Sequence, residues 1–239
     1  MNKLLYILSI ISSVFSFSCA DSYRIVGTSN IWDIDGKTIT LMSAEDNQWR
    51  MLDSCEVLHG QFQMKGKVDS NMITTLFLDG YPIMPVILEP GNMDITISKM
   101  VFKVEGTPLN DSLYAFIASK YKLDMRFVEM ERMESQMIMN GNPQHEIQHY
   151  VDSVYQVLSE DMQGLVCNFI GSNYDNVLGL CGFSMLCNGL PYPVITPLIQ
   201  SVIDAAPQSF LDHPTIADFL RQAQENMEKY GMADIAFGR

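Results

Sequence analysis

The chain has 239 residues, of which 15 are basic and 28 are acidic, so its net charge is −13 at pH 7. This charge disfavours nucleic acid and anionic lipid surfaces as partners, because both carry dense negative charge. The hydrophobic fraction of 47% excludes a chain that is disordered throughout.

Residues 1–18 are predicted to be a secretory signal peptide. Lys3 supplies the basic start, and the stretch from Leu4 to Phe17 is apolar with only serines interspersed. That stretch is shorter than the roughly 20 apolar residues that a membrane-spanning helix needs. The small residue Ser18 directly precedes Cys19, as in a lipoprotein signal. We therefore expect lipidation of Cys19, which would tether the protein to a membrane of the cell envelope, with the outer membrane as the expected location. Ordinary cleavage near Ala20 and retention as an uncleaved anchor are the alternatives.

Residues 19–106 are predicted to form an antiparallel β-rich domain that resembles a sandwich or a barrel. Apolar and polar residues alternate, most clearly in Gln61 to Val68, and glycine-bearing turns separate the segments. Asp35-Gly36 is interpreted as a hairpin turn. The expected strands are Tyr23–Gly27, Lys37–Met42, Ser54–Leu58, Gln61–Val68, Thr74–Leu78, Ile83–Leu88, Asp94–Ile97 and Phe102–Val104.

Residues 107–239 are predicted to form a helical domain, which makes the chain α+β. The spacing of apolar residues changes to that of a helix after Gly106. The first helix is expected to end by Asn140-Gly141, and the second to run from Asn142-Pro143 to Gly171. Asn173 is a candidate cap for a third helix, while Thr196-Pro197 and His213-Pro214 each suit the first turn of a further helix, the latter closing at Gly231. One face of the first helix, and its methionine-rich part from Met125 to Met139, are interpreted as core. That face carries Leu113, Phe116, Ile117, Tyr121, Met125 and Val128.

Four cysteines remain after Cys19, namely Cys55, Cys167, Cys181 and Cys187. Disulfides persist in exported proteins, and four cysteines allow three pairings. Burial as small apolar residues is the other interpretation. No C-x-x-C is present, so a thioredoxin-type motif is excluded.

The segment His145-Glu146-Ile147-Gln148-His149 matches H-E-x-x-H, the signature in which two histidines bind zinc and the glutamate activates water. A zinc-dependent peptidase is therefore one hypothesis. It requires a third protein ligand, and the extended motif is absent because Asp152 and Tyr155 occupy the positions of its glycine and third histidine. On a helix, both histidines would lie roughly opposite the apolar stripe, which is typical of solvated surface residues.

The order and spacing of several segments resemble a domain of unknown function found at the N-terminus of envelope lipoproteins whose C-terminal module is thioredoxin-like, of the thiol-disulfide interchange type. This resemblance implies a compact β-rich domain followed by helices, and a lipid-anchored location. The redox activity of such relatives is not carried over, since the residues that perform it are not present in this sequence. The segments are Tyr23–Gly27, Asp35–Lys37, Asp53-Ser54, Gly60–Gly66, Leu88–Gly91, Val104–Thr107 with Asn110, and Asn173–Asn176.

The sequence thus favours an exported, lipid-anchored protein that is not an enzyme and that binds an unidentified protein or small molecule. No catalytic residue, metal ligand or cofactor is assigned. The two alternatives are the zinc-dependent peptidase and an accessory protein of a thiol-disulfide system that uses a labile pair among the four cysteines.

Overall fold

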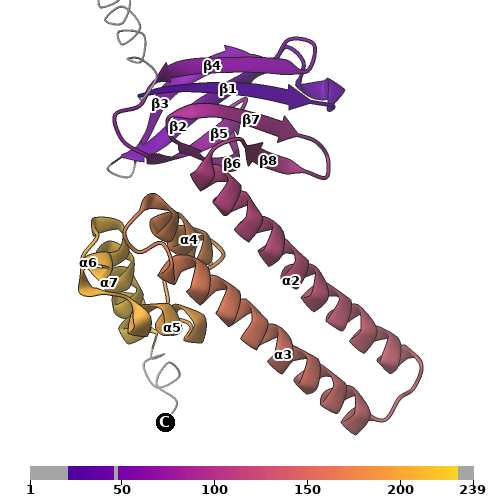
Figure 1. Ribbon diagram of the computed structural model, residues 1–239. Coiled ribbons are helices and arrows are strands. Elements are labelled where there is room, and N and C mark those ends of the chain that lie inside the picture. Colours follow the sequence, from indigo (N-terminus) through magenta and orange to yellow (C-terminus); the bar gives the residue numbers. More distant parts are fainter. Residues whose placement is uncertain (1–20, 46–47, 231–239) are drawn as a thin grey trace, which may run out of the picture. The chain divides into compact units, whose positions relative to one another are not determined.

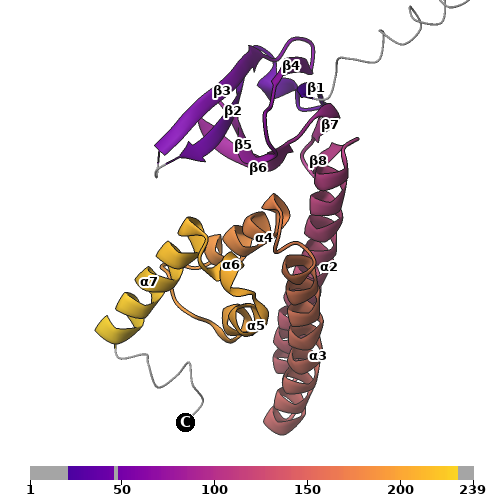
Figure 2. The same cartoon turned by 60° about the vertical axis from the view of Figure 1, so that its left-hand side comes forward.

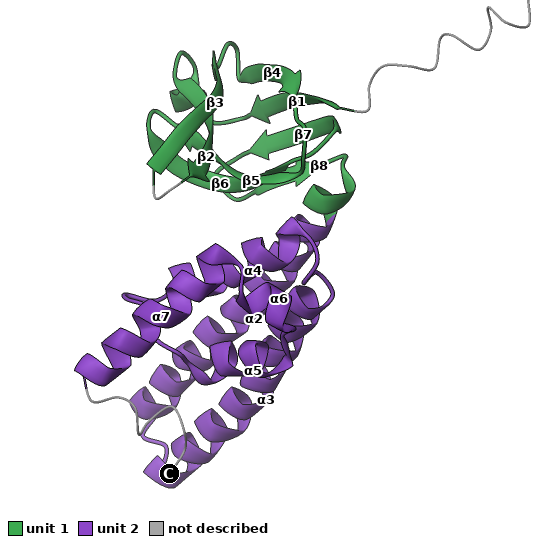
Figure 3. Ribbon diagram, turned by 90° about the vertical axis from the view of Figure 1, so that its left-hand side faces the viewer, with its two compact units in different colours: residues 1–111 green, residues 112–239 purple. Residues whose placement is uncertain are grey.

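A computed structural model describes residues 21–45 and 48–230, so the signal segment and Cys19 lie outside the described residues (Figure 1). The described chain divides into a β-rich unit, which extends to Asp111, and a helical unit, which begins at Ser112 (Figure 3). The predicted α+β class is confirmed, with strands first and helices after them. The division falls a few residues beyond the predicted boundary at residue 106.

All eight predicted strands are present, and they form two four-stranded sheets (Figure 1). In the first sheet the order is β4 (Gln61–Lys67), β1 (Ser22–Ser29), β7 (Gly91–Ile97) and β8 (Phe102–Glu105). In the second sheet the order is β3 (Gln48–Glu56), β2 (Thr38–Glu45), β5 (Met72–Leu78) and β6 (Tyr81–Leu88).

The two sheets face each other as a sandwich (Figure 2). The interior of the sandwich is apolar. Because side chains alternate along a strand, every second residue points inward. Ile25 and Met93 of the first sheet are completely buried, as are Leu41 and Leu76 of the second. The outward face of the first sheet is instead polar and exposed along β4 and β7.

One strand pair departs from the predicted antiparallel arrangement, because β1 pairs with β7 in parallel. The other five pairs are antiparallel. Strands that are distant in sequence are not joined by a hairpin, so either direction is open to them. The hairpin predicted at Asp35-Gly36 is also wrong, since β1 and β2 belong to different sheets. Those two residues follow a short 3-10 helix, η1 (Trp32–Ile34), in the connection between the sheets.

At two positions across β1 and β4, a glycine of one strand lies opposite an aromatic residue of the other. Phe62 faces Gly27, and Tyr23 faces Gly66. A Cβ atom on Gly27 would lie 2.0 Å from Cζ of Phe62, and a Cβ atom on Gly66 would lie 2.8 Å from the ring of Tyr23. Each ring therefore covers the backbone of the glycine opposite it. These contacts explain why the two glycines interrupt otherwise regular strands.

The helical unit contains six helices among the described residues (Figure 2). The helix predicted at Thr196-Pro197 is present, and a short helix that was not predicted follows it. The bounds are α2 (Pro108–Met139), α3 (Gln144–Gly171), α4 (Val177–Asn188), α5 (Pro197–Ala205), α6 (Gln208–Leu211) and α7 (Pro214–Lys229). The first four residues of α2 belong to the β-rich unit. The predicted stop at Gly231 lies outside the described residues.

The cap of α4 is Asn176, whose side chain accepts a hydrogen bond from the N–H of Leu178 at 2.8 Å. The predicted cap, Asn173, instead donates to the carbonyl of Phe169 at 2.7 Å. Its Oδ1 also accepts from the amide of Asn176 at 2.9 Å, so Asn173 orients the capping residue.

The core of the helical unit lies between the C-terminal half of α3, the start of α2 and the shorter helices. Phe116 of α2 stacks on Phe169 of α3 with ring centroids 4.0 Å apart. Gly182 of α4 allows a close approach to α3, because a Cβ atom there would lie 3.0 Å from Phe169. The buried cluster is Phe116, Val166, Ile170, Phe183, Ile199, Val202, Phe210 and Ile216.

The predicted buried face of α2 is only half right. Leu113 and Phe116 are buried, but Tyr121 and Val128 are more than half exposed, and Met125 is nearly so. The far half of α2 packs against α3 alone, through a different face that includes Phe127, whose ring contacts Tyr155. The methionine-rich part is likewise divided, since Met130 is buried whereas Met139 is exposed.

No helix in residues 21–45 and 48–230 combines the length and apolar character that crossing a membrane requires.

Candidate functional site

The H-E-x-x-H segment lies in the first turns of α3, where His145, Glu146 and His149 are all exposed. Ile147, between the two histidines, is buried and lies on the opposite face of the helix. Within the described part of the chain, no three His, Cys, Asp or Glu side chains come together in a group that could hold a metal ion. Zinc requires at least three protein ligands in a catalytic site. The geometry therefore gives the zinc hypothesis no support.

The cysteines Cys55, Cys167, Cys181 and Cys187 are free thiols. Burial raises the pKa of Cys181 and of Cys187 to about 12. Burial also raises the pKa of Cys167 and that of Cys55, although the backbone N–H of Gln63 partly offsets the effect at Cys55. Since the thiolate is the reactive form, these side chains behave as small apolar residues near neutral pH. The redox hypothesis gains no support from them.

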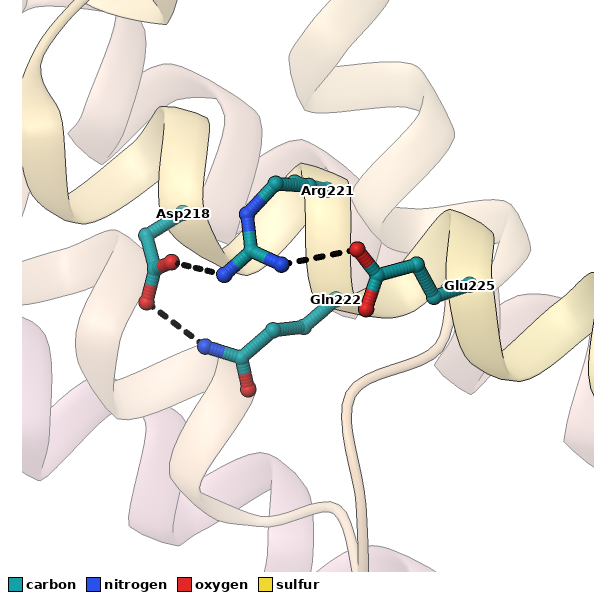
Figure 4. A network of polar contacts seen from close by, with 4 residues as sticks. All are labelled: Asp218, Arg221, Gln222 and Glu225. Carbon is teal, nitrogen blue, oxygen red and sulfur yellow. Dashed lines mark hydrogen bonds and ion pairs between the residues drawn. The ribbon is translucent and has the colours of Figure 1, made fainter.

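A polar network on α7 joins Asp218, Arg221, Gln222 and Glu225 (Figure 4). The hydrogen bond from Arg221 lowers the pKa of Asp218 and raises the pKa of Arg221. All the partners lie three or four residues apart on one helix, at the spacing of surface side chains. Asp218, Arg221 and Glu225 are about half exposed, so the network is a solvated helix surface and not a reactive site.

The better candidate lies at one end of the sandwich, where three connections meet. The N–H of Ser29, at the end of β1, donates to the carbonyl of Gly60 at 2.7 Å. Gly60 has a φ of +70°, and a Cβ atom there would lie 2.5 Å from the carbonyl oxygen of Ser29, so only glycine fits. On the other side of β1, Ser29 is in register with Ile97, where the turn between β7 and β8 begins. The connections β1–β2, β3–β4 and β7–β8 are therefore neighbours.

These connections carry large apolar side chains in solvent, and together we name them the distal loop surface. Met100 is 94% exposed and Trp32 is 81% exposed, the two highest values among the large apolar side chains of the described residues. The distal loop surface consists of Trp32, Leu58, Met100, Val101 and Phe102.

A depression of about 450 Å³ lies beside Trp32, which is the one member of this surface that lines it. Polar groups of Asn30, Asp35 and His59 line it, together with the backbone of Gly60. Asp35 is held in place because its Oδ1 accepts a hydrogen bond from the N–H of Gly60 at 3.1 Å. An aromatic anchor next to a few fixed polar groups is the usual composition of a binding site.

Sequence reasoning did not identify this surface. His59 lies in the turn between β3 and β4, with a φ of +54° and its side chain in solvent. The available signal was the presence of large apolar residues between strands, at Ile31-Trp32 and at Met100-Val101. Their proximity depends on the parallel pairing of β1 and β7, which the sequence pattern does not contain.

Residues 23–113 match the model of a protein family described as a domain of unknown function (DUF4369). The match extends from β1 through β8 to the start of α2, which is the β-rich unit. No curated protein matches the chain. The β-rich unit is therefore similar to a domain of unknown function, which supports this coarser part of the resemblance.

Proposed function

We propose that the protein is an exported, lipid-anchored protein of the cell envelope that acts as a binding module and not as an enzyme. The distal loop surface carries this proposal, because it exposes Trp32 and Met100, and because Trp32 lies beside a depression lined by polar groups. The partner is unidentified. The resemblance to domains that precede thioredoxin-like modules makes a thioredoxin-like protein the first partner to test.

The anchor is supported by the sequence around Cys19 and by the position of β1. Cys19 precedes the first residue of β1, Ser22, by three positions. β1 then runs for eight residues, or about 25 Å, to the distal loop surface. A lipid on Cys19 would thus hold one end of the sandwich at the membrane while the binding surface stands at the other end.

The anchor is tested by the mass of the mature N-terminal peptide and by fractionation. We expect lipid on Cys19 of the native protein, and we expect Cys19→Ala to remove the protein from the membrane fraction. A mature chain that begins at another residue without lipid, or unchanged fractionation of Cys19→Ala, would refute the anchor.

Binding is tested by two variants that each remove two exposed apolar side chains. A partner that co-purifies with the native protein should be lost from Trp32→Ser/Met100→Ser. It should be retained by Tyr121→Ser/Val128→Ser, which removes exposed apolar side chains from α2. Equal retention by both variants would show that the distal loop surface does not bind. Reproducible catalytic turnover that a single substitution abolishes would show that the protein is an enzyme.

A further inference from the structure

Three cations are grouped at the opposite end of the sandwich, on the outward face of the first sheet. Arg24 of β1 lies directly opposite Lys65 of β4, and Lys67 follows on the same face of β4. All three side chains are exposed. On the other side of Arg24, the residue in register on β7 is Asn92, whose amide extends the row. We name Arg24, Lys65 and Lys67 the proximal basic cluster.

Among the described residues, no ion pair involves this cluster. The other cations of the β-rich unit, apart from Lys99, form ion pairs, namely Lys37 with Asp79, Arg50 with Glu45 and Lys103 with Glu105. None of the three cluster cations has a carboxylate oxygen within 4.0 Å among the described residues. The three cluster cations therefore lie side by side without an ion pair, whereas most other cations of the β-rich unit have one.

The arrangement costs stability unless an anion is bound. Like charges that lie directly opposite each other on neighbouring strands repel, as Arg24 and Lys65 do here. A depression of about 550 Å³ lies beside them, lined also by Asn92. Gly66 and Gly91 line it as well, so the backbone leaves room for a ligand there. Two cations and an amide around an open space are suited to phosphate oxygens.

The place of the cluster in the chain indicates the source of the anion. Ser22 lines the same depression and follows Cys19 by three residues, which span at most about 11 Å. We propose that the proximal basic cluster binds the phosphate groups of anionic phospholipids in the membrane to which Cys19 is anchored. This proposal rests on the proposed anchor, and it assigns the orientation of the β-rich unit, with its proximal end on the membrane.

The acidic net charge of the whole chain does not prevent this contact. At physiological salt a charge acts over about 8 Å, so the membrane senses only the nearest residues. Asp21 and Asp69 flank the end of the cluster, and neither forms an ion pair with it in the described chain. Each lysine or arginine near an anionic surface increases binding by about fivefold.

Lysine acetylation followed by mass spectrometry tests the contact on the native lipidated protein. On vesicles with about 30 mol% phosphatidylglycerol in phosphatidylcholine, we expect Lys65 and Lys67 to be acetylated about fivefold more slowly than on pure phosphatidylcholine. Lys99 at the distal end and Lys122 on α2 are exposed controls whose rates should not change. Equal rates on the two vesicles at Lys65 and Lys67 would overturn the proposal. Protection by inorganic phosphate without vesicles would also overturn it, because the site would then bind a free anion.

A charge-matched pair of variants supplies the second measurement. In a Cys19→Ala background, where no lipid dominates sedimentation, Lys65→Glu/Lys67→Glu should reduce the remaining sedimentation with the anionic vesicles by more than about tenfold, whereas Lys99→Glu/Lys122→Glu should leave it near the level of Cys19→Ala alone. Equal loss in both variants would mean that only net charge matters, against the proposal. Fluorescence of Trp32 and Trp49 verifies that each variant is folded. The mass of the N-terminal peptide reports the lipid on Cys19 separately, so failure of the anchor is distinguished from failure of the cluster.

Discussion

The side chain of Asn110 forms two hydrogen bonds with the backbone of Ile87, donating to its carbonyl at 2.7 Å and accepting from its N–H at 3.0 Å. β6 is an edge strand of its sheet, so Asn110 takes the place that a neighbouring strand would have. Oε1 of Glu89 accepts from the backbone N–H groups of Leu109 and Asn110, which caps the start of α2. Buried polar residues thus fix the first turn of α2 to the sandwich.

Asn110→Ala should lower the free energy of unfolding of the β-rich unit by about 3 kcal/mol, because it leaves buried backbone groups of Ile87 without partners. Urea titration with tryptophan fluorescence measures this, since Trp32 and Trp49 both lie in that unit. Asn71→Ala, at an exposed position between β4 and β5, is the control and should change the free energy by less than about 0.5 kcal/mol. Equal effects of the two substitutions would contradict the role assigned to Asn110.

Gly27→Ala should destabilise the β-rich unit by about 2 kcal/mol, because the added methyl group would overlap the ring of Phe62. The cost should be smaller when Phe62→Leu is already present, since the ring is then gone. Thermal unfolding of the four proteins of this double-mutant cycle gives the coupling. Gly164→Ala on α3, where nothing lies within 4 Å of the new methyl group, should be neutral or stabilising. Purely additive effects at Gly27 and Phe62 would refute the pairing.

The buried thiols Cys181 and Cys187 should react slowly with iodoacetamide at pH 8 in the folded protein and quickly in denaturant. Their pKa of about 12 exceeds the ordinary value of 9.0, so their contribution to stability is complete below pH 9 and is lost as the pH rises towards 12. Intact mass after alkylation counts the thiols. A mass that shows a disulfide in the native protein before reduction would contradict the assignment of free cysteines.

Protein purified without a histidine tag should contain less than about 0.1 zinc per chain, because no residue in the described part of the chain completes a metal-binding group with His145 and His149. His149→Ala should leave that value unchanged. Elemental analysis provides the measurement. Near-stoichiometric zinc that is lost in His149→Ala would establish a metal site on α3.

The local pattern of the sequence predicts which segments form strands and helices, but it does not predict which strands pair with one another. Apolar and polar residues alternate so regularly from Gln61 to Lys67 that β4 can be predicted from the sequence alone. The parallel pairing of β1 with β7 depends on contacts between strands more than 60 residues apart, and no local pattern records it. The proximal basic cluster was hidden for the same reason, since Arg24 and Lys65 become neighbours only through the register of β1 and β4.

The failure on α2 has a different cause. Tyr121, Met125 and Val128 repeat at the spacing of a buried face, and the same face is buried earlier in the helix at Tyr114. The periodicity of the sequence shows that an apolar face exists. Whether other helices extend far enough to bury that face depends on the tertiary structure, which the periodicity does not contain. The distal loop surface could not be predicted for a related reason, because the sequence alone does not show whether Trp32 is exposed or buried.

The most direct test of a binding role for the distal loop surface is site-specific photo-crosslinking in living cells. A benzoylphenylalanine placed at Met100 or at Trp32 should give one discrete crosslinked product, because both side chains face the partner. The same residue at Gln63, on the outward face of the first sheet, should not give that product. No product from Met100 and Trp32, or the same product from all three positions, would contradict the account.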